Sequence, residues 1–298
     1  MLKYQSWIDK NTHSLSDKLV LIVGGTGSIG KSVIEYLLYL NAKIIIAARN
    51  VDKANKVKEE LLKDYPNGVI DIESLDISDL NSIDNFQYEI DCKYPKIDYF
   101  INNAGVYSLP HGFSKQGYEI HFATNALGNY YLAKKIIFNL KTNATMIFTS
   151  SISYNFNKIN FNDFEGIHYR NGIKRYGLTK RIMTFNTLHL KNTLEGNQLA
   201  INLVHPGICA TELFTKTKSK IYRYLAYPFM KFMFHNSSKA ALSIISGLFT
   251  ETRFNEWIGP RFLGIWGLPK VSKLSKKIAM NNINKVHGIT EIMLSVKR

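Results

Sequence analysis

Short apolar runs alternate with amphipathic segments along the first two thirds of the chain. Between the apolar runs, hydrophobic residues recur at helical spacing, at about 29–40, 52–63, 79–91, 117–139 and 175–194. The apolar runs themselves cover residues 17–23, 43–48, 69–75, 97–101, 144–150 and 199–206. Strands separated by helices predict βαβ units, and therefore an α/β fold with a doubly wound parallel sheet and helices on both faces. Ligands of such sheets bind at the carboxyl ends of the strands.

The C-terminal third has a less regular pattern. SSKAALSIISGLF, residues 237–249, predicts an amphipathic helix with a serine cap, and WIGPRFLGIWG predicts a short strand followed by a loop. KLSKKIAMNNINK is basic and helical in character, while Trp257 and Trp266 are interpreted as packing residues. Because no repeat, Pro-rich linker or low-complexity segment divides the chain, we expect one domain over residues 1–298.

Composition excludes several classes of protein. The chain has 298 residues, 45% of them hydrophobic, which is enough for a sizeable core. Its two cysteines, Cys92 and Cys209, form no C-x-x-C pair, which argues against a disulfide framework or a cysteine metal site. The N-terminus has no apolar leader segment, and no apolar run approaches the roughly 18 residues of a membrane span. A cytoplasmic protein without a metal is the resulting expectation.

The positive charge is concentrated at the C-terminal end. Residues 215–298 contain 15 Lys and Arg against 3 Glu, a net charge of +12 out of +15 for the chain. Residues 214–236 mix basic side chains with Tyr222, Tyr224, Tyr227, Phe229, Phe232 and Phe234, a combination that predicts an aromatic lid over an apolar substrate. A solvated lysine-rich surface and peripheral contact with an anionic membrane both fit this composition. No recognition motif supports nucleic-acid binding.

The first apolar run ends in the glycine-rich turn VGGTGSIGKS. Gly24, Gly27 and Gly30 allow close backbone approach, and the helix that follows offers free N–H groups to a pyrophosphate. This is the phosphate loop of a Rossmann-type fold, and Thr26, Ser28 and Ile29 complete it.

The second apolar run is followed directly by Arg49, 25 residues after Gly24, where a carboxylate would bind the adenosine ribose of NAD. An arginine favours the 2′-phosphate of NADP, so NADP(H) is preferred over NAD(H), although Asp52 nearby keeps NAD(H) open.

Together, these and later motifs resemble the short-chain dehydrogenase/reductase family from Lys18 to about Thr211. The resemblance implies a role for each matching residue. Asp76 and Ile77 would contact adenine, and NNAG, with Asn103, Ala104 and Gly105, would shape the loop beside the adenosine ribose. NALG supplies Asn125 and FTSS supplies Ser151 as catalytic residues, while VHPGICAT supplies Pro206, Gly207 and Thr211 for the nicotinamide carboxamide. Residues 18–211 would then form the cofactor-binding and catalytic core, with 212–298 covering the substrate.

The spacing Tyr-x-x-x-Lys occurs six times, so it identifies an active site only in context. The pairs begin at Tyr39, Tyr130, Tyr131, Tyr154, Tyr176 and Tyr227. Tyr176 and Lys180 alone follow the serine strand and precede VHPG, which is where the family has its active-site pair. On a helix they share one face.

The resemblance implies a mechanism in which Tyr176 is the general acid in reduction and the base in oxidation. A lysine ammonium about 4 Å away stabilises an ionised tyrosine by about 4 kcal/mol at an effective dielectric near 20. Lys180 would provide this charge and bind the nicotinamide ribose. Ser151 would hold the substrate oxygen, and Asn125 would hold a water that relays protons from Lys180.

The 25 residues from Ser151 to Tyr176, with the insertion NFNDFEGIHYRNG, are similar to the retinol-dehydrogenase-like and protochlorophyllide-reductase-like subgroups of the compact branch. They imply an NADP(H)-dependent oxidoreductase acting on a carbonyl or alcohol, with a lipophilic substrate indicated by the aromatic lid.

Three points stay open. The glycine turn lacks the usual Thr-Gly start, and its spacing also resembles the extended branch with its nucleotide-sugar epimerases, although NNAG and VHPG favour the compact branch. A non-catalytic dinucleotide-binding or membrane-associated regulatory protein is the main alternative. Family members often form homo-oligomers through the helices expected at 117–139 and 175–194, but not all do.

Overall fold

Eight strands form one sheet in the computed structural model, which describes residues 2–107, 109–156, 158–194, 198–208, 236–274 and 278–296. The spatial order is β3-β2-β1-β4-β5-β6-β7-β8. All neighbouring strands from β3 to β7 are parallel, and β8 is antiparallel to β7. The strands are β1 (Leu19–Val23), β2 (Lys43–Ala48), β3 (Val69–Ser74), β4 (Ile97–Asn102), β5 (Leu140–Thr149), β6 (Ala200–Val204), β7 (Glu256–Phe262) and β8 (Trp266–Lys273). The predicted doubly wound α/β sheet and its six apolar strands are confirmed.

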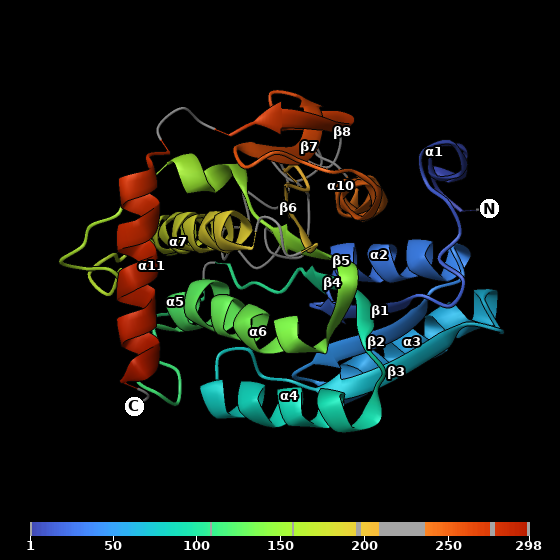
Figure 1. Cartoon of the computed structure of the whole chain (residues 1–298), viewed down its shortest axis with the longest axis horizontal. Coiled ribbons are helices and arrows are strands. Elements are labelled where there is room, and N and C mark those ends of the chain that lie inside the picture. Colours follow the sequence, from blue (N-terminus) through green and yellow to red (C-terminus); the bar gives the residue numbers. More distant parts are fainter. Residues whose placement is uncertain are drawn as a thin grey trace, which may run out of the picture.

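Helices cover both faces of this sheet (Figure 1). One face carries α2 (Ser28–Tyr39), α3 (Val51–Asp64) and α10 (Ser237–Phe249); the other carries α4 (Leu80–Lys93), α6 (Asn129–Ile136) and α7 (Gly172–Thr193). Alternate residues of β1 divide between the two cores, since Val20 and Ile22 pack in one while Leu19, Leu21 and Val23 pack in the other. A strand buried on both faces must be apolar throughout, which explains why the strands are continuous hydrophobic runs.

The long helix predicted at 117–139 is interrupted. Its parts are α5 (Ile120–Phe122), the π-helix η1 (Ala123–Gly128), α6 and the 3-10 helix η2 (Ile137–Asn139). Asn129 explains part of the distortion, because its side chain donates to the carbonyls of Thr124 and Asn125, both at 3.0 Å. Gly128 packs against the loop that follows β3. A Cβ atom at Gly128 would lie 1.8 Å from the carbonyl oxygen of Ile77. Packing that the sequence period does not encode therefore sets the shape of this segment.

Other differences concern helix ends and the sheet edge. The cap of α10 is Asn236, which accepts from the N–H of Lys239 at 2.8 Å, so the predicted serine cap is wrong. Helix α7 begins at Gly172 because Asn171 caps it. The predicted loop after β7 contains a second strand, β8, whose Pro269 is tolerated at an edge position. An N-terminal helix, α1 (Gln5–Asn11), was not expected; it buries Ile8.

The C-terminal helix α11 (Met280–Ser295) crosses the outer side of α6 and α7 (Figure 1). Glu291 accepts from Tyr130 at 2.5 Å and pairs with Lys134 at 2.8 Å, while Thr290 binds Asn186 at 3.1 Å. These contacts hold α11 against α6 and α7. The sequence predicted a helix over the basic segment 273–285, which overlaps only the first part of α11. Within the described ranges, no helix is long and apolar enough to span a membrane.

Candidate active site

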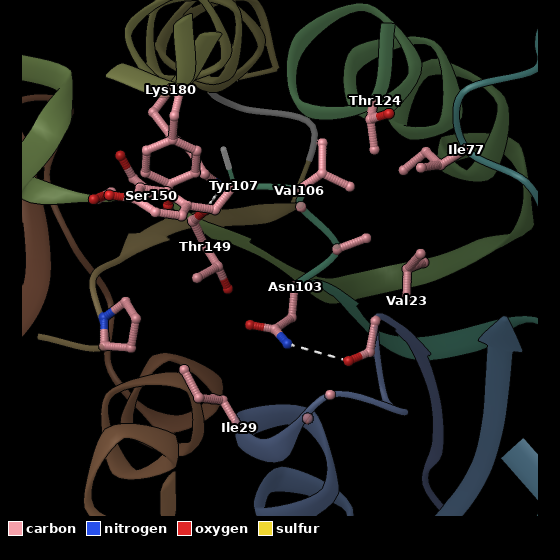
Figure 2. Close-up of a pocket in the computed structure, with 18 of the residues that line it drawn as sticks. Val23, Ile29, Ile77, Asn103, Val106, Tyr107, Thr124, Thr149, Ser150 and Lys180 are labelled. Atoms are coloured by element: carbon pink, nitrogen blue, oxygen red, sulfur yellow. Dashed lines mark hydrogen bonds between the residues drawn. The ribbon is translucent and has the colours of Figure 1, made fainter. Parts of the chain in front are cut away.

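A cavity of about 580 Å³ opens at the carboxyl ends of the central strands (Figure 2). It collects residues from loops that lie far apart in the sequence. Of the predicted site residues, those that line it are Gly24, Thr26, Gly27, Ser28, Ile29, Gly30, Arg49, Asp76, Ile77, Asn103, Ala104, Gly105, Ser151, Tyr176, Lys180, Pro206 and Gly207. Asn125 lies behind the wall, and Thr211 lies outside the described residues, as do the aromatic residues at 222–234 of the predicted lid. Among the described residues, no group of acidic, histidine and cysteine side chains could hold a metal ion.

The glycine turn packs so tightly against neighbouring backbone that side chains at Gly24 and Gly30 would clash with it. Gly24 has φ +82°, and a Cβ there would lie 2.8 Å from the backbone of Ala104. A Cβ on Gly30 would lie 2.2 Å from the carbonyl oxygen of Gly24. Helix α2 begins at Ser28 with no side-chain cap on Gly27, so its first N–H groups face the cavity without a protein acceptor in their helix. This cradle fits a pyrophosphate.

Two cations stand at the adenosine end of this cavity. Arg49 follows β2 and is exposed, and Lys53 lies one turn into α3. Lys53 was missed in the sequence, where nothing separates it from the many other lysines. Asp52, its neighbour, is exposed and does not line the cavity.

Asp76 and Ile77 lie in the loop after β3 at the same end. The Asp76 carboxylate accepts from the N–H and hydroxyl of Ser78 at 3.0 and 2.6 Å. Ile77 is buried and presents an apolar edge to the cavity, as Figure 2 shows. An aromatic base fits between an apolar wall and a fixed acceptor.

The end of β4 joins the glycine turn to the middle of the cavity. The side-chain amide of Asn103 donates to the carbonyl of Gly24 at 3.4 Å, the contact drawn in Figure 2. Asn125, fully buried in η1, binds both polar backbone groups of Val106, accepting from its N–H at 2.7 Å and donating to its carbonyl at 2.8 Å. Its side chain therefore holds the loop after β4, a function that its sequence motif does not reveal.

Tyr176 and Lys180 meet at the far end of the cavity from Arg49. Their i, i+4 spacing on α7 brings the Lys180 ammonium 5.8 Å from the centroid of the Tyr176 ring. Ser151 lines the same cavity and caps the 3-10 helix η3 (Ile152–Asn155), its hydroxyl oxygen accepting from Ser153.

Lys180 is an unusual lysine. Only 4% of it is exposed, and its ammonium donates to the carbonyl of Thr149 at 2.7 Å. Burial lowers its pKa to about 8. An ammonium whose proton is held this loosely can take part in proton exchange near neutral pH.

The other Tyr-x-x-x-Lys pairs of the described residues lie elsewhere. Tyr154 is completely buried in the core, Tyr39 binds Asp9 on the surface, and Tyr131 binds Asp84. Tyr130 is held by α11, and the Tyr227 pair lies outside the described residues. Among the described tyrosines of these pairs, Tyr176 is thus the one that lines the cavity.

Beyond Tyr176 the wall becomes apolar. Figure 2 shows Val106 and Tyr107 on this side, and the Tyr107 ring meets that of Tyr176 edge-on at 4.9 Å. Further lining residues here are Ile152, Phe156, Ile173 and Ile208. None of them was predicted, because single apolar residues in loops carry no periodic signal.

Sequence comparison finds one family and consistent relatives. The family model described as "short chain dehydrogenase" matches residues 18–221. Short-chain dehydrogenase TIC 32 B, chloroplastic, from Brassica napus is 34% identical over 217 residues, covering 68% of each chain. Retinol dehydrogenase 14 from Mus musculus is 31% identical over 66% of this chain and 62% of its own. Retinol dehydrogenase 12 from Bos taurus is 29% identical over 83% and 81%.

Solved structures agree on the fold. A protein from Mycobacterium Paratuberculosis superimposes with a TM-score of 0.72 at 20% identity, covering 96% of this chain and 93% of that one. L-Sorbose reductase from Gluconobacter frateurii, solved with NADPH and L-sorbose, gives 0.64 at 16% identity, covering 89% and 99%. Identities this low carry information about the fold only.

Proposed function

This chain belongs to the short-chain dehydrogenase family of oxidoreductases, and we propose that it uses NADP(H) to interconvert a carbonyl and an alcohol on a lipophilic substrate. The observation that carries the proposal is one continuous cavity with a phosphate cradle and two cations at one end and Tyr176, Lys180 and Ser151 at the other. The retinol dehydrogenases among its relatives support the assignment to a lipophilic alcohol or aldehyde.

Cofactor choice rests on Arg49 and Lys53. Both side chains carry only hydrogen-bond donors, and both line the end of the cavity where we expect the adenosine ribose of a bound dinucleotide. A 2′-phosphate would gain charge-assisted hydrogen bonds there, whereas the free hydroxyls of NAD(H) would leave the two cations without a partner from the ligand. The remaining predicted contacts, from the glycine turn, Asp76, Ile77 and residues 103–105, would serve either dinucleotide. Pro206, Gly207 and Thr211 would hold the carboxamide.

Proton transfer is assigned to Tyr176. The bound nicotinamide supplies or accepts the hydride, and the protein must exchange one proton with the substrate oxygen. Ser151 donates a hydrogen bond to that oxygen and orients it, while the Tyr176 hydroxyl gives up its proton in reduction. Lys180 stabilises the tyrosinate that results and binds the nicotinamide ribose. Asn125 supports this site by holding Val106, and a water beside it would relay protons from Lys180.

The first test is a thermal-shift titration of the whole chain with NADPH, NADP, NADH and NAD. A ligand at 100 times its Kd should add about 2.7 kcal/mol of stability. We expect stabilisation by NADPH that is lost in Arg49→Ala, with Lys174→Ala on the exposed start of α7 as the charge-matched control. No shift with any of the four would contradict every dinucleotide-binding function and leave the membrane-associated regulatory alternative.

The second test follows NADPH oxidation with a panel of lipophilic aldehydes and ketones. Tyr176→Phe should abolish turnover while leaving the NADPH shift intact, because it removes only the proton donor. Full kcat in this variant would refute the assignment. Turnover of nucleotide sugars instead of carbonyl compounds would support the epimerase alternative.

We assign residues 18–211 to cofactor binding and catalysis and residues 212–298 to covering the substrate. In the described part of the latter, β7 and β8 extend the sheet and α10 covers one of its faces. Gly264 at the turn between β7 and β8 lies beside His205 and Ile152, which line the cavity. A cytoplasmic location stays a prediction from cysteine usage.

Peripheral contact with an anionic membrane is supported by the hairpin of β7 and β8. Its tip exposes Phe262 at 59% and Leu263 at 87%. Leu263 has φ +52°, an unfavourable conformation for a branched apolar residue in contact with water. Trp266, 43% exposed, carries the Lys239 ammonium over its ring at 4.1 Å. Apolar tips with cationic neighbours suit the interface of an anionic bilayer.

A homo-oligomer through the helices at 117–139 and 175–194 would have to accommodate α11, which lies across them. Light scattering on the whole chain and on a variant with Glu291→Ala, which loosens α11, would show whether this helix controls association.

A further inference from the structure

A buried charged cluster lies beside the cavity without lining it. Glu119 and His121 are fully buried, and Arg175, the residue before Tyr176 on α7, is 3% exposed. Burying a carboxylate and a guanidinium costs several kcal/mol unless every polar group is matched. The partners that these groups have found are therefore informative about what the cluster does.

Glu119 is held by backbone and side chain together. One carboxylate oxygen accepts from the N–H groups of His121 and Phe122 at 2.8 and 2.9 Å. The other lies 2.9 Å from His121 Nδ1 and 3.4 Å from Arg175 Nε. The carboxylate thus fixes both of the other members of the cluster.

The cluster ends on the two backbone polar groups of a single residue, Leu109. The Leu109 N–H donates to His121 Nε2 at 2.9 Å, and its carbonyl accepts from Arg175 Nη2 at 3.1 Å. Because Nε2 is an acceptor, the ring proton is on Nδ1 and is donated to Glu119. Arg175 Nη1 donates to the carbonyl of Tyr169 at 2.8 Å, which ties in the insertion before α7 as well.

Three residues earlier, Val106 is held in the same way by Asn125. Tyr107 lies between these two anchors, and its ring contacts Tyr176 at 4.9 Å. The anchored loop is therefore the wall of the cavity that faces the reacting tyrosine. Arg175 binds this loop and stands next to Tyr176 in the chain, so it connects the two directly.

We propose that Glu119, His121 and Arg175 are positioning residues that fix the backbone at Leu109, and through it Tyr107, against Tyr176, so that a substrate carbonyl is held at the distance needed for proton transfer. This rests on the proposed function, in which Tyr176 is the proton donor. A cluster that only stabilises the fold would lower stability when broken, without a specific effect on this loop or on carbonyl reduction.

The first experiment measures hydrogen exchange in the whole chain. Arg175→Lys keeps the charge but loses the planar fork that reaches Glu119, Leu109 and Tyr169, and His121→Phe removes both ring hydrogen bonds. The control is Asp98→Asn, a buried acid at the opposite end of β4 that accepts from the N–H of Leu19 at 3.0 Å. We expect exchange in peptides covering 106–112 to rise about tenfold in the two cluster variants and to stay unchanged in the control. Unchanged exchange there in both folded cluster variants would overturn the proposal.

The second experiment measures NADPH-dependent reduction of nonanal well below the melting temperature of each variant. Arg175→Lys should lower kcat/KM by about tenfold while the Kd of NADPH stays within about twofold, and Asp98→Asn should change neither. In a Tyr107→Ala background the Arg175→Lys effect should shrink, because both act through one loop. If the effects of Arg175→Lys and Tyr107→Ala on the free energy derived from kcat/KM are fully additive, Arg175 does not act through Tyr107. If the wild type itself does not reduce nonanal, the proposed function is in doubt, while the exchange experiment still decides the anchoring.

Discussion

Replacing Lys180 with methionine should stabilise the ligand-free protein at neutral pH and abolish its activity. The structure supplies the magnitude. Burial lowers the pKa of Lys180 from 10.5 to about 8, and each pKa unit is worth about 1.4 kcal/mol, so the folded state gives up about 3 kcal/mol by holding the charge. Methionine fills similar space without a charge. Its own cost is the lost hydrogen bond to the Thr149 carbonyl, about 1 kcal/mol and independent of pH.

The sign of the pH dependence follows from linkage. Below pH 8 the lysine is charged in both states and the full penalty applies. Between the folded pKa of about 8 and the ordinary value of 10.5, the unfolded chain keeps a proton that the folded chain releases, so wild-type stability rises with pH. Above that range the penalty is gone. The stability difference between Lys180→Met and wild type should therefore fall by about 3 kcal/mol, from an advantage of about 2 kcal/mol at pH 7 to a disadvantage of about 1 kcal/mol at pH 10.5.

Urea unfolding of both proteins at pH 7, 8, 9 and 10.5, without cofactor, measures this difference directly. Lys174→Met is the matched control, because Lys174 lies exposed near the start of the same helix and pays no burial penalty. A difference between wild type and Lys180→Met that stays constant with pH would show that the ammonium is not held charged in a buried site. The electrostatic account of Tyr176 would then fail with it.

Three further outcomes test other parts of the structure. Gly30→Ala should abolish the thermal shift with NADPH, because its Cβ would lie 2.2 Å from the Gly24 carbonyl; retained affinity in a titration would show that the turn is not the phosphate cradle. Leu263→Glu should weaken co-sedimentation with vesicles containing anionic lipid, and Phe138→Glu, 75% exposed at a distant site, should not; equal binding by both would exclude the hairpin. Burial lowers the pKa of His189 and of His287, which stack at 3.5 Å, so unfolded chains bind more protons as the pH falls below about 6.5 and stability declines. His287→Asn should flatten that decline in urea unfolding between pH 7 and pH 5, and an unchanged slope would assign it to other groups.

Much of the fold could be predicted because its signals are local. Strands buried on both faces must be continuous apolar runs, and Ile44, Ile45 and Ile46 in β2 show this. Glycines that a ligand or backbone approaches cannot be replaced, so the turn at Gly24 and Gly30 is visible in the sequence. Tyr176 could be selected from six similar pairs through the order of the motifs around it.

Features that depend on contacts between distant segments were missed. Strand β8 carries Pro269 and has weak strand character, and it forms because β7 offers an unpaired edge. The interruption of the predicted 117–139 helix follows from Gly128 lying against Ile77, which the helical period does not record. Lys53 resembles any other surface lysine until α3 places it beside Arg49.

The sequence alone determined the kind of chemistry, because a phosphate turn, a serine strand and a Tyr-Lys pair need particular residues at short fixed spacings. Only the tertiary structure decided how these residues are supported. Asn125 holds Val106, and Glu119, His121 and Arg175 hold Leu109, through hydrogen bonds between segments up to 66 residues apart. Tertiary packing decides which residues become hydrogen-bond partners across such distances. In the sequence, a polar residue that makes such a contact cannot be told from one that does not.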